Sequence, residues 1–182
     1  MAALFVARHA PTATESGTCI GQLDVLTHRD PLEVAEALLS NWPRAGGVHC
    51  VWSSPLRRCS EVARVLAARW GVPQRIDSRL LEISYGRWEG RRWEEIELAD
   101  RDALHAWMTN WQRQGPPGGE SAAMVEARVR SWWQSLRIEE DEVLIAHAGV
   151  IRALRVIGAG YSWDDAMQMS VPHAAWTSIA KR

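Results

Sequence analysis

Two stretches of the chain decide its fold: Leu4-Phe5-Val6-Ala7-Arg8-His9-Ala10 near the start and Val143-Leu144-Ile145-Ala146-His147-Ala148-Gly149 near the end. Each is a short apolar run typical of a buried strand, and each closes on a histidine followed by a small residue. In open α/β sheets, ligand sites lie just beyond the carboxyl ends of the strands. The two runs therefore predict a pair of strands that deliver His9 and His147 to one site.

Strand-like and helix-like patterns alternate along the rest of the chain. Further strands are expected over 48–52, 74–76 and 175–180, and helices over 55–70, 92–112, 121–136 and 149–158, with one more helix opened by Asp30-Pro31. The segment 81–90 is irregular, and Gly115-Pro116-Pro117-Gly118-Gly119 interrupts the helical pattern. This alternation predicts a single three-layer α/β/α domain over residues 1–182, with a mostly parallel sheet and helices on both faces.

Net charge, cysteine content and the length of the apolar runs restrict the kinds of partner and the cellular setting. The 182 residues carry a net charge of −1, which argues against a nucleic acid or an anionic membrane as partner. Cys19, Cys50 and Cys59 are odd in number and form no CxxC pair, so a reduced, cytoplasmic setting is expected rather than a disulfide framework. No run reaches the roughly 18 apolar residues that cross a bilayer, and the start lacks a signal-peptide pattern. We therefore expect a cytoplasmic protein without a nucleic-acid or membrane partner.

The polar residues at the strand ends suit a phosphorylated ligand. Arg8 stands beside His9, and the strand expected over 48–52 runs into Ser53-Ser54-Pro55-Leu56-Arg57, which supplies another cation. Guanidinium groups grip phosphate oxygens bidentately, and a histidine can attack phosphorus or donate a proton. His147 opens a helix, whose free N–H groups favour an anion. A lone histidine at a strand end is more often structural, but two of them with two arginines favour phosphoryl transfer.

A leaving alkoxide needs a proton, and Glu82 in Leu80-Leu81-Glu82-Ile83-Ser84-Tyr85-Gly86 is the carboxylate best placed by context. On its own, Glu82 is as well explained as an ordinary surface acid, and Glu89 is the next candidate for the role. The other histidines show neither HxH nor HExxH spacing and are interpreted as structural or surface residues: His28, His49, His105 and His173.

Five motifs, in order along nearly the whole chain, resemble those of the histidine phosphatase (phosphoglycerate mutase-like) superfamily. They are Arg8-His9-Ala10 for RHG, Ser53-Ser54-Pro55-Leu56-Arg57-Arg58 for SSPLxR, the acid-bearing loop 81–90, Pro117-Gly118-Gly119-Glu120-Ser121, and His147-Ala148-Gly149-Val150-Ile151-Arg152. In strict register the SSPLxR arginine is Arg58, and Arg57 is the variable residue.

The resemblance implies a phosphoglycerate mutase-like fold and a role for each matching residue. His9 is the expected nucleophile of a phosphomonoesterase with a phosphohistidine intermediate. Arg8, Arg58 and His147 form the expected phosphate pocket, and no metal or other cofactor is needed. Glu82 is expected to protonate the leaving group and then to activate water. The region of about 81–121 is expected to border the mouth of the site.

Within the superfamily the chain is most similar to α-ribazole phosphatase-type members of the cobalamin pathway. The loop 17–25 resembles their G-x-C-Y-G-x-x-D-V pattern, with Ile20 in place of Tyr, and segments around 86–93 and 116–121 are also typical of them. This implies α-ribazole 5′-phosphate as substrate, with Gly21, Trp88 and Trp93 as substrate-binding residues. The indoles of Trp88 and Trp93 are expected to stack on the planar base of that substrate. Trp107 and Trp111, four residues apart, are expected to pack onto the core instead.

Two residues depart from the family pattern. Ala10 replaces the glycine of RHG, and Glu15 stands where many members carry a substrate-binding Asn. Because an acid at that place would repel a phosphate, the substrate contacts of this loop are left open.

Other activities also stay open. They are a broad-specificity sugar-phosphate phosphatase, a mutase-type phosphotransferase, a protein phosphohistidine phosphatase, and an inactive module that only binds a phospholigand. The last is disfavoured because a mere binder has no reason to keep a proton donor. The sequence predicts no oligomeric state.

Overall fold

A five-stranded sheet forms the centre of the protein, whose computed structural model describes residues 2–179. The strand order is β3-β2-β4-β1-β5. The strands are β1 (Leu4–Arg8), β2 (Val51–Ser53), β3 (Gln74–Ile76), β4 (Glu142–Ala146) and β5 (Trp176–Ile179). Only β5 is antiparallel to its neighbour, β1. The predicted mostly parallel sheet is therefore present, although residue 180 of the strand expected over 175–180 lies outside the described residues.

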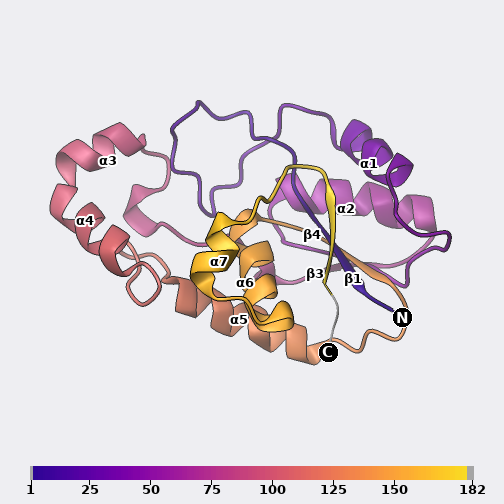
Figure 1. The fold of residues 1–182 in the computed structure, drawn as a ribbon. Helices are drawn as coiled ribbons and strands as arrows, with labels where there is room; N and C mark the ends of the chain where they lie inside the picture. Colours follow the sequence, from indigo (N-terminus) through magenta and orange to yellow (C-terminus); the bar gives the residue numbers. More distant parts are fainter. Residues whose placement is uncertain (1, 180–182) are drawn as a thin grey trace.

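Helices cover both faces of the sheet (Figure 1). On one face lie α1 (Pro31–Ser40) and α2 (Arg57–Trp70), and on the other α5 (Ala122–Ser135), α6 (Ala148–Ala159) and α7 (Trp163–Gln168). The alternating side chains of β1 divide between two cores: Phe5 packs with residues of α1 and α2, whereas Leu4 and Val6 pack with residues of α5 and α6. The period-two pattern of a strand buried on both faces thus fixes the three layers.

Local signals set several helix ends. The Asp30 carboxylate accepts a hydrogen bond from the backbone N–H of Leu32 at 2.7 Å, and Pro31 follows as expected for a first turn. Gly71 ends α2 in the left-handed conformation, at φ 67°. The helix expected over 55–70 begins only at Arg57, because the chain is still extended at Leu56.

The segment 81–121 extends to one side of the sheet and carries the short 3₁₀ helix η2 (Gly86–Trp88), α3 (Trp93–Ala99) and α4 (Arg101–Asn110) (Figure 1). The 3₁₀ helix η1 (Ser78–Leu80) precedes it. One helix was expected over 92–112, but Asp100 leaves helical geometry with φ −127° and divides it in two. Its carboxylate accepts hydrogen bonds from Trp88 and Arg91, which hold the break in place. No helix among the described residues is long and apolar enough to span a membrane.

Candidate active site

The two histidines of the strand ends come together at one edge of the sheet. Arg8 of β1 pairs in register with Ala146 of β4, and the His9 N–H donates to the Ala146 carbonyl at 3.0 Å. The rings of His9 and His147 lie 5.2 Å apart between centroids and are both buried. Register between two parallel strands, rather than any loop, therefore sets the spacing of the two imidazoles.

Both imidazoles are neutral at physiological pH. Burial lowers the pKa of His9 to about 3, and the Arg58 and Arg8 guanidiniums push it in the same direction. Burial also lowers the pKa of His147 well below its usual value. His9 Nδ1 lies 2.6 Å from the Ala10 carbonyl oxygen, which can only accept, so this nitrogen carries the proton. The lone pair of the neutral ring then resides on Nε2, the atom that can attack an electrophile.

Two arginines reach the same edge. Arg58 is only 3% exposed, and its Nη1 and Nη2 donate to the carbonyls of Leu23 at 2.6 Å and Gly21 at 2.8 Å. Arg8 donates through Nη1 to the Val171 carbonyl at 3.2 Å. Arg57, by contrast, is exposed and pairs with Glu61. The strict register of the SSPLxR pattern therefore picks out the buried arginine and not its neighbour.

Glu82 lies against the start of α6. Its Oε1 accepts hydrogen bonds from the backbone N–H groups of Ile83 at 2.9 Å and Gly149 at 3.1 Å. A Cβ on Gly149 would lie 2.4 Å from that oxygen, so a larger residue here would have to displace the Glu82 carboxyl group. Burial raises the pKa of Glu82, although the two N–H groups and the Arg58 and Arg8 charges oppose the rise. The carboxyl group is therefore biased toward the protonated form that a proton donor needs.

A cavity of about 580 Å³, the phosphate cavity from here on, collects most of these groups. Its lining includes Arg8, His9, Gly21, Arg58, Glu82, Tyr85, Trp93, His173 and much of the loop 11–20. His147 does not line it, because its ring is fully buried behind His9 with the Cys59 Sγ 3.5 Å from Nε2. The structure thus brings together all five residues expected for phosphoryl transfer, four at the cavity wall and one beneath it.

The expectation for Trp88 is wrong. Its side chain is fully buried, and Nε1 donates to the Asp100 carboxylate at 3.1 Å. No face of this indole is open to a ligand, because it packs with Cys19 and Ile96 in a small core of its own. Trp93 does line the phosphate cavity, where its ring stacks on Trp107 with centroids 6.1 Å apart. Both tryptophans lie in or beside the irregular loop, so this position in the sequence did not distinguish Trp93, which lines the cavity, from Trp88, which is buried in a core.

The two departures from the family pattern have local explanations. Glu15 is exposed at the rim of the phosphate cavity, where Arg92 forms an ion pair with it. Its charge is therefore balanced by a neighbour rather than turned on a bound phosphate. Ala10 is fully buried and its methyl group packs in the core under α1 and α2, away from the cavity.

Glu89 holds the backbone in place. Its Oε1 accepts from the N–H groups of Gln22 and Tyr85 and from the Ser84 hydroxyl, at 3.1, 2.9 and 3.2 Å. A Cβ on Gly21, whose φ is +51°, would lie 2.3 Å from this oxygen. Glu89 does not line the phosphate cavity. The glycine is thus required by the close approach of Glu89, whatever it contributes to a ligand.

His173, interpreted from sequence as structural or surface, lies in the site. Its Nδ1 donates to the His9 carbonyl at 2.6 Å, and the two rings are 5.4 Å apart between centroids. It also lines the phosphate cavity. The signal available in the sequence was its place just before the last strand: because β5 runs antiparallel to β1, the residues before it return to the carboxyl edge of the sheet.

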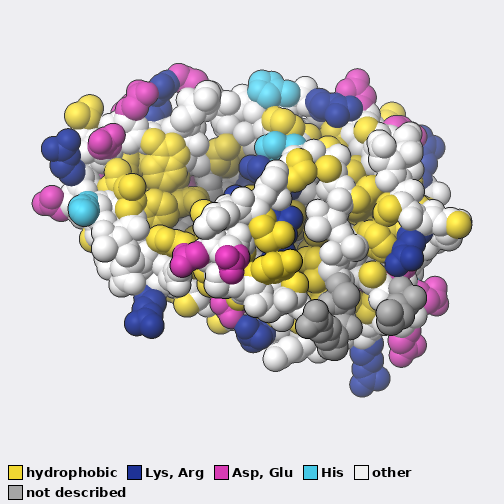
Figure 2. Space-filling model, in the orientation of Figure 1, with side chains coloured by type: hydrophobic (Ala, Val, Ile, Leu, Met, Phe, Trp, Pro, Cys, Tyr) yellow, Lys and Arg dark blue, Asp and Glu magenta, His cyan; other side chains and the backbone are white. Residues whose placement is uncertain are grey.

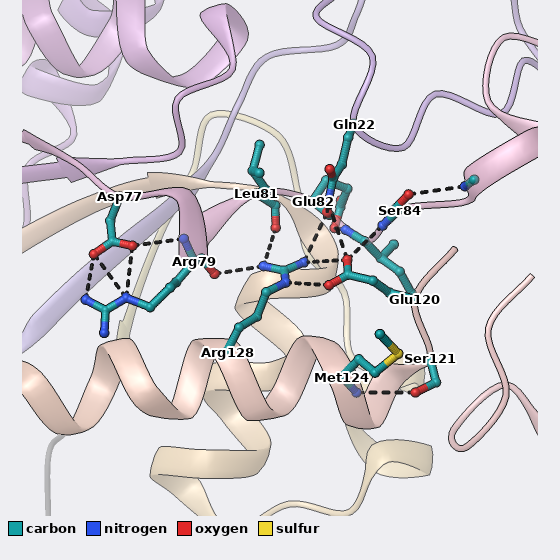
Figure 3. Close-up of polar contacts among 12 residues, drawn as sticks. Gln22, Asp77, Arg79, Leu81, Glu82, Ser84, Glu120, Ser121, Met124 and Arg128 are labelled. Carbon is teal, nitrogen blue, oxygen red and sulfur yellow. Dashed lines mark hydrogen bonds and ion pairs between the residues drawn. The ribbon is translucent and has the colours of Figure 1, made fainter. Parts of the chain in front are cut away.

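A half-buried arginine of α5 ties the acid-bearing loop to the layer of helices (Figure 3). Arg128 donates to the carbonyls of Arg79, Leu81 and Glu82 and to both carboxylate oxygens of Glu120, over 2.7–3.1 Å. Glu120 in turn accepts from the Ser84 N–H at 3.0 Å. The backbone on both sides of Glu82 is therefore fixed from beneath. Within residues 2–179, no group of three or more His, Cys, Asp or Glu is arranged to hold a metal ion.

Comparison with known proteins identifies the family to which this site belongs. The family model of the histidine phosphatase superfamily (branch 1) matches residues 4–181. The chain belongs to that superfamily, as its motifs indicated, and it is a phosphatase acting on phosphate monoesters.

Individual relatives differ in the substrate their names give. The chain is 31% identical to glucosyl-3-phosphoglycerate phosphatase of Mycolicibacterium vanbaalenii, over 97% of this chain and 83% of the relative. It is 31% identical to the adenosylcobalamin/alpha-ribazole phosphatase of Salmonella typhimurium, over 80% of this chain and 67% of the relative. The crystal structure of the alpha-ribazole phosphatase from Shigella flexneri superposes with a TM-score of 0.84 at 23% identity, covering 98% of this chain and 90% of that one. This likeness confirms the expected fold.

Proposed function

We propose that the protein hydrolyses small phosphate monoesters through a phosphohistidine on His9. The observation that carries the proposal is the state of that ring: buried, neutral, and with its proton held on Nδ1 by the Ala10 carbonyl. Nε2 is thereby left as a free nucleophile at a cavity that two arginines also line. An imidazole in this state needs no separate base to activate it.

Hydrolysis takes place in two steps. His9 Nε2 attacks phosphorus, the ester P–O bond breaks, and the leaving oxygen takes the proton of the Glu82 carboxyl group. Water then gives a proton to Glu82 and its oxygen attacks phosphorus, which breaks the P–N bond and releases inorganic phosphate. Arg8 and Arg58 neutralise the non-bridging oxygens as charge moves onto them, and the fully buried His147 packs beside His9 with its ring centroid 5.2 Å away.

The finer candidate for substrate is α-ribazole 5′-phosphate. It is supported by the pattern of the loop 17–25 and by the Salmonella relative. Of the two indoles expected to stack on its base, only Trp93 lines the phosphate cavity. A cytoplasmic setting without nucleic acid or membrane partner belongs to the same proposal, supported by a net charge of −1 and by three cysteines that are buried and free.

Trapping the intermediate tests the mechanism. The wild type, quenched in acid after mixing with ³²P-labelled substrate, is expected to carry acid-labile phosphate on His9, and His9→Ala none. Turnover by His9→Ala is expected to fall roughly 10³-fold or more. His105→Ala, on the exposed face of α4, is the matched control and keeps its activity. Label on a carboxylate, or full activity of His9→Ala, would exclude the mechanism.

A further inference from the structure

His173, in the segment before β5, presents a fixed imidazole to the phosphate cavity. Its Nδ1 donates to the His9 carbonyl at 2.6 Å, and the N–H of the next residue, Ala174, donates to the Arg8 carbonyl at 2.9 Å. Ala174 adopts the left-handed conformation, at φ 48°, which is unfavourable for a residue with a side chain. Backbone strain of this kind is common at functional sites, and here it lies directly beside the proposed nucleophile.

The other ring nitrogen of His173 is free. Because a carbonyl oxygen can only accept, Nδ1 carries the proton of the neutral ring, and Nε2 holds a lone pair. Nε2 has no hydrogen-bond partner among residues 2–179, and the ring is half-buried at the wall of the phosphate cavity. A purely structural role would be complete with the Nδ1 hydrogen bond. The unpaired Nε2 is therefore left for a ligand.

The cavity wall around this nitrogen is built for an anion. Arg8 and Arg58 line the same cavity, and the rings of His173 and His9 lie 5.4 Å apart between centroids. Figure 2 shows basic and histidine side chains together in the hollow beside α3 and α4. A phosphoryl group that His9 attacks has to lie against these arginines. Its non-bridging oxygens are therefore within reach of the His173 ring.

The His173 ring of the free protein is neutral at physiological pH. Burial lowers the pKa of His173 and the Arg8 charge lowers it further, whereas the hydrogen bond to the His9 carbonyl opposes the change. An unprotonated Nε2 next to a phosphate oxygen would bring two lone pairs together. A proton between the two atoms converts this repulsion into a charge-assisted hydrogen bond, and the negative charge of the ligand favours uptake of that proton.

Other titratable or charged side chains face the same cavity from α2, the acid-bearing loop and the loop before α1: Arg58, Glu82, Tyr85, Glu15 and His28. Arg58 keeps its charge at any physiological pH, and burial raises the pKa of Tyr85 away from neutrality. Glu15 is balanced by its ion pair with Arg92. Glu82 and the exposed His28 are the two groups that can also take up a proton near an anion, so the experiment has to separate them from His173.

We propose that His173 is a third cationic contact of the bound phosphoryl group: its Nε2 takes up a proton from solvent as the anion binds and donates it in a hydrogen bond to a non-bridging oxygen. The inference rests on the proposed phosphatase function and adds a substrate-contacting residue to its phosphate pocket. No bond to phosphorus changes in this step, and the contact is the same for α-ribazole 5′-phosphate as for any other monoester.

Sulfate is the probe, because it stays a dianion and takes up no proton near neutral pH. Its inhibition constant against p-nitrophenyl phosphate, measured between pH 7 and 8, is expected to rise about tenfold per pH unit for each proton that accompanies the anion. His173→Gln offers an amide donor that does not titrate, so its slope is expected to be one proton lower than that of the wild type. Glu82 is present in both proteins, and its own contribution cancels in this difference.

His173→Asn separates the two ring nitrogens. Its shorter amide can replace the Nδ1 donor to the His9 carbonyl but does not extend to the position of Nε2. The slope is expected to fall by one proton as in His173→Gln, and sulfate is expected to bind roughly tenfold more weakly than to His173→Gln. His105→Gln, exposed on α4 and outside the phosphate cavity, is the control that leaves both the slope and the inhibition constant unchanged.

NMR of the histidine ring nitrogens tests the same proton without turnover. Saturating sulfate at pH 7.5 is expected to convert the His173 Nε2 signal from an unprotonated to a protonated nitrogen. An unchanged slope in His173→Gln, a slope that falls in His28→Gln instead, or a His173 ring that stays unprotonated at saturating sulfate would overturn the proposal. Because the NMR result needs no turnover, it stands even if the phosphohistidine mechanism fails, and its own failure would leave the role of His9 untouched.

Discussion

The floor of the phosphate cavity and its 81–121 side are built by different means. At the floor, His9 and His147 follow paired strands, and their positions come from the sheet register and from burial. On the 81–121 side, the chain is mostly irregular between short helices. Its position is fixed by carboxylates that accept hydrogen bonds from backbone N–H groups of this segment and of the neighbouring loop. Glu89 accepts from Gln22 and Tyr85, and Glu120 accepts from Ser84.

The difference shows how one fold can keep its chemistry while its substrate changes. Strand register cannot shift by a fraction of a residue, so the reacting groups stay where they are. A segment held by a few polar anchors can be rebuilt by exchanging those anchors and the aromatic residues between them. Substitutions at the floor are therefore expected to affect every substrate, whereas substitutions on the 81–121 side are expected to affect substrates differently.

The largest effect is expected from a pair of neighbouring arginines at the floor. Arg58→Met removes a buried guanidinium at the phosphate cavity and is expected to lower kcat/KM roughly 10³-fold for all esters. Arg57→Met removes only an exposed ion pair with Glu61 and is expected to stay within about twofold of wild type. Steady-state kinetics on p-nitrophenyl phosphate and an alkyl phosphate measures both, with a thermal melt to confirm folding. Comparable losses in the two variants would remove Arg58 from the phosphate pocket.

The next effect compares two carboxylates of the 81–121 side. Glu82→Gln is expected to lower hydrolysis of alkyl phosphates by about 10²-fold, because an amide has no acidic proton to give the leaving oxygen. The loss on p-nitrophenyl phosphate is expected to be much smaller, since p-nitrophenolate leaves without help. Glu89→Gln disturbs only the anchoring of the loop, so both substrates should lose equally. If Glu82→Gln loses equally on both, the proton donor is another group.

Sequence reasoning succeeded where the signal was local and periodic. The runs ending at His9 and His147, the start of α1 at Asp30 and the end of α2 at Gly71 all lie where the pattern placed them or within a residue or two. The register of SSPLxR also distinguished Arg58 from Arg57: Arg58 is buried on α2 and lines the phosphate cavity, whereas Arg57 is exposed.

It failed where long-range contacts decide. The helical period continues through Asp100, but its carboxylate is engaged by Trp88 and Arg91 and the helix is divided there. The helix α7 has only six residues, too few for a periodic pattern. His173 reaches the site because β5 is antiparallel, and strand direction at a sheet edge is not written in the strand itself. Trp88 was misassigned because burial of a loop residue depends on what folds over it.

Arg128 tests the link between the two regions. It is 18% exposed at the side chain and donates to three backbone carbonyls and the Glu120 carboxylate (Figure 3). Arg128→Met removes this donor from three part-buried carbonyls and from the Glu120 carboxylate, and is expected to lower the free energy of unfolding by roughly 3 kcal/mol. Arg130→Met, on the same helix, breaks an exposed pair with Glu126 and is expected to cost less than about 1 kcal/mol. Urea unfolding measures both, and equal costs would show that the Arg128 network does not hold the loop.

The smallest effect concerns the protonation of His9 at the floor of the phosphate cavity. In the folded protein His9 stays neutral down to a pKa of about 3, whereas in the unfolded chain it takes a proton near pH 6.5. Below pH 6.5 the unfolded state therefore binds more protons, and the free energy of unfolding falls as the pH falls. Between pH 7.5 and 5.5 this group alone is expected to account for about 1.4 kcal/mol of lost stability.

His147 adds a loss of the same sign, and Glu82, whose folded pKa is raised, opposes both. His9→Asn keeps the latter two groups, so urea unfolding at the two pH values should show the loss reduced by about 1.4 kcal/mol relative to wild type. An unchanged loss would mean that the pKa of His9 is the same in the folded and unfolded states, so that burial does not keep the ring neutral.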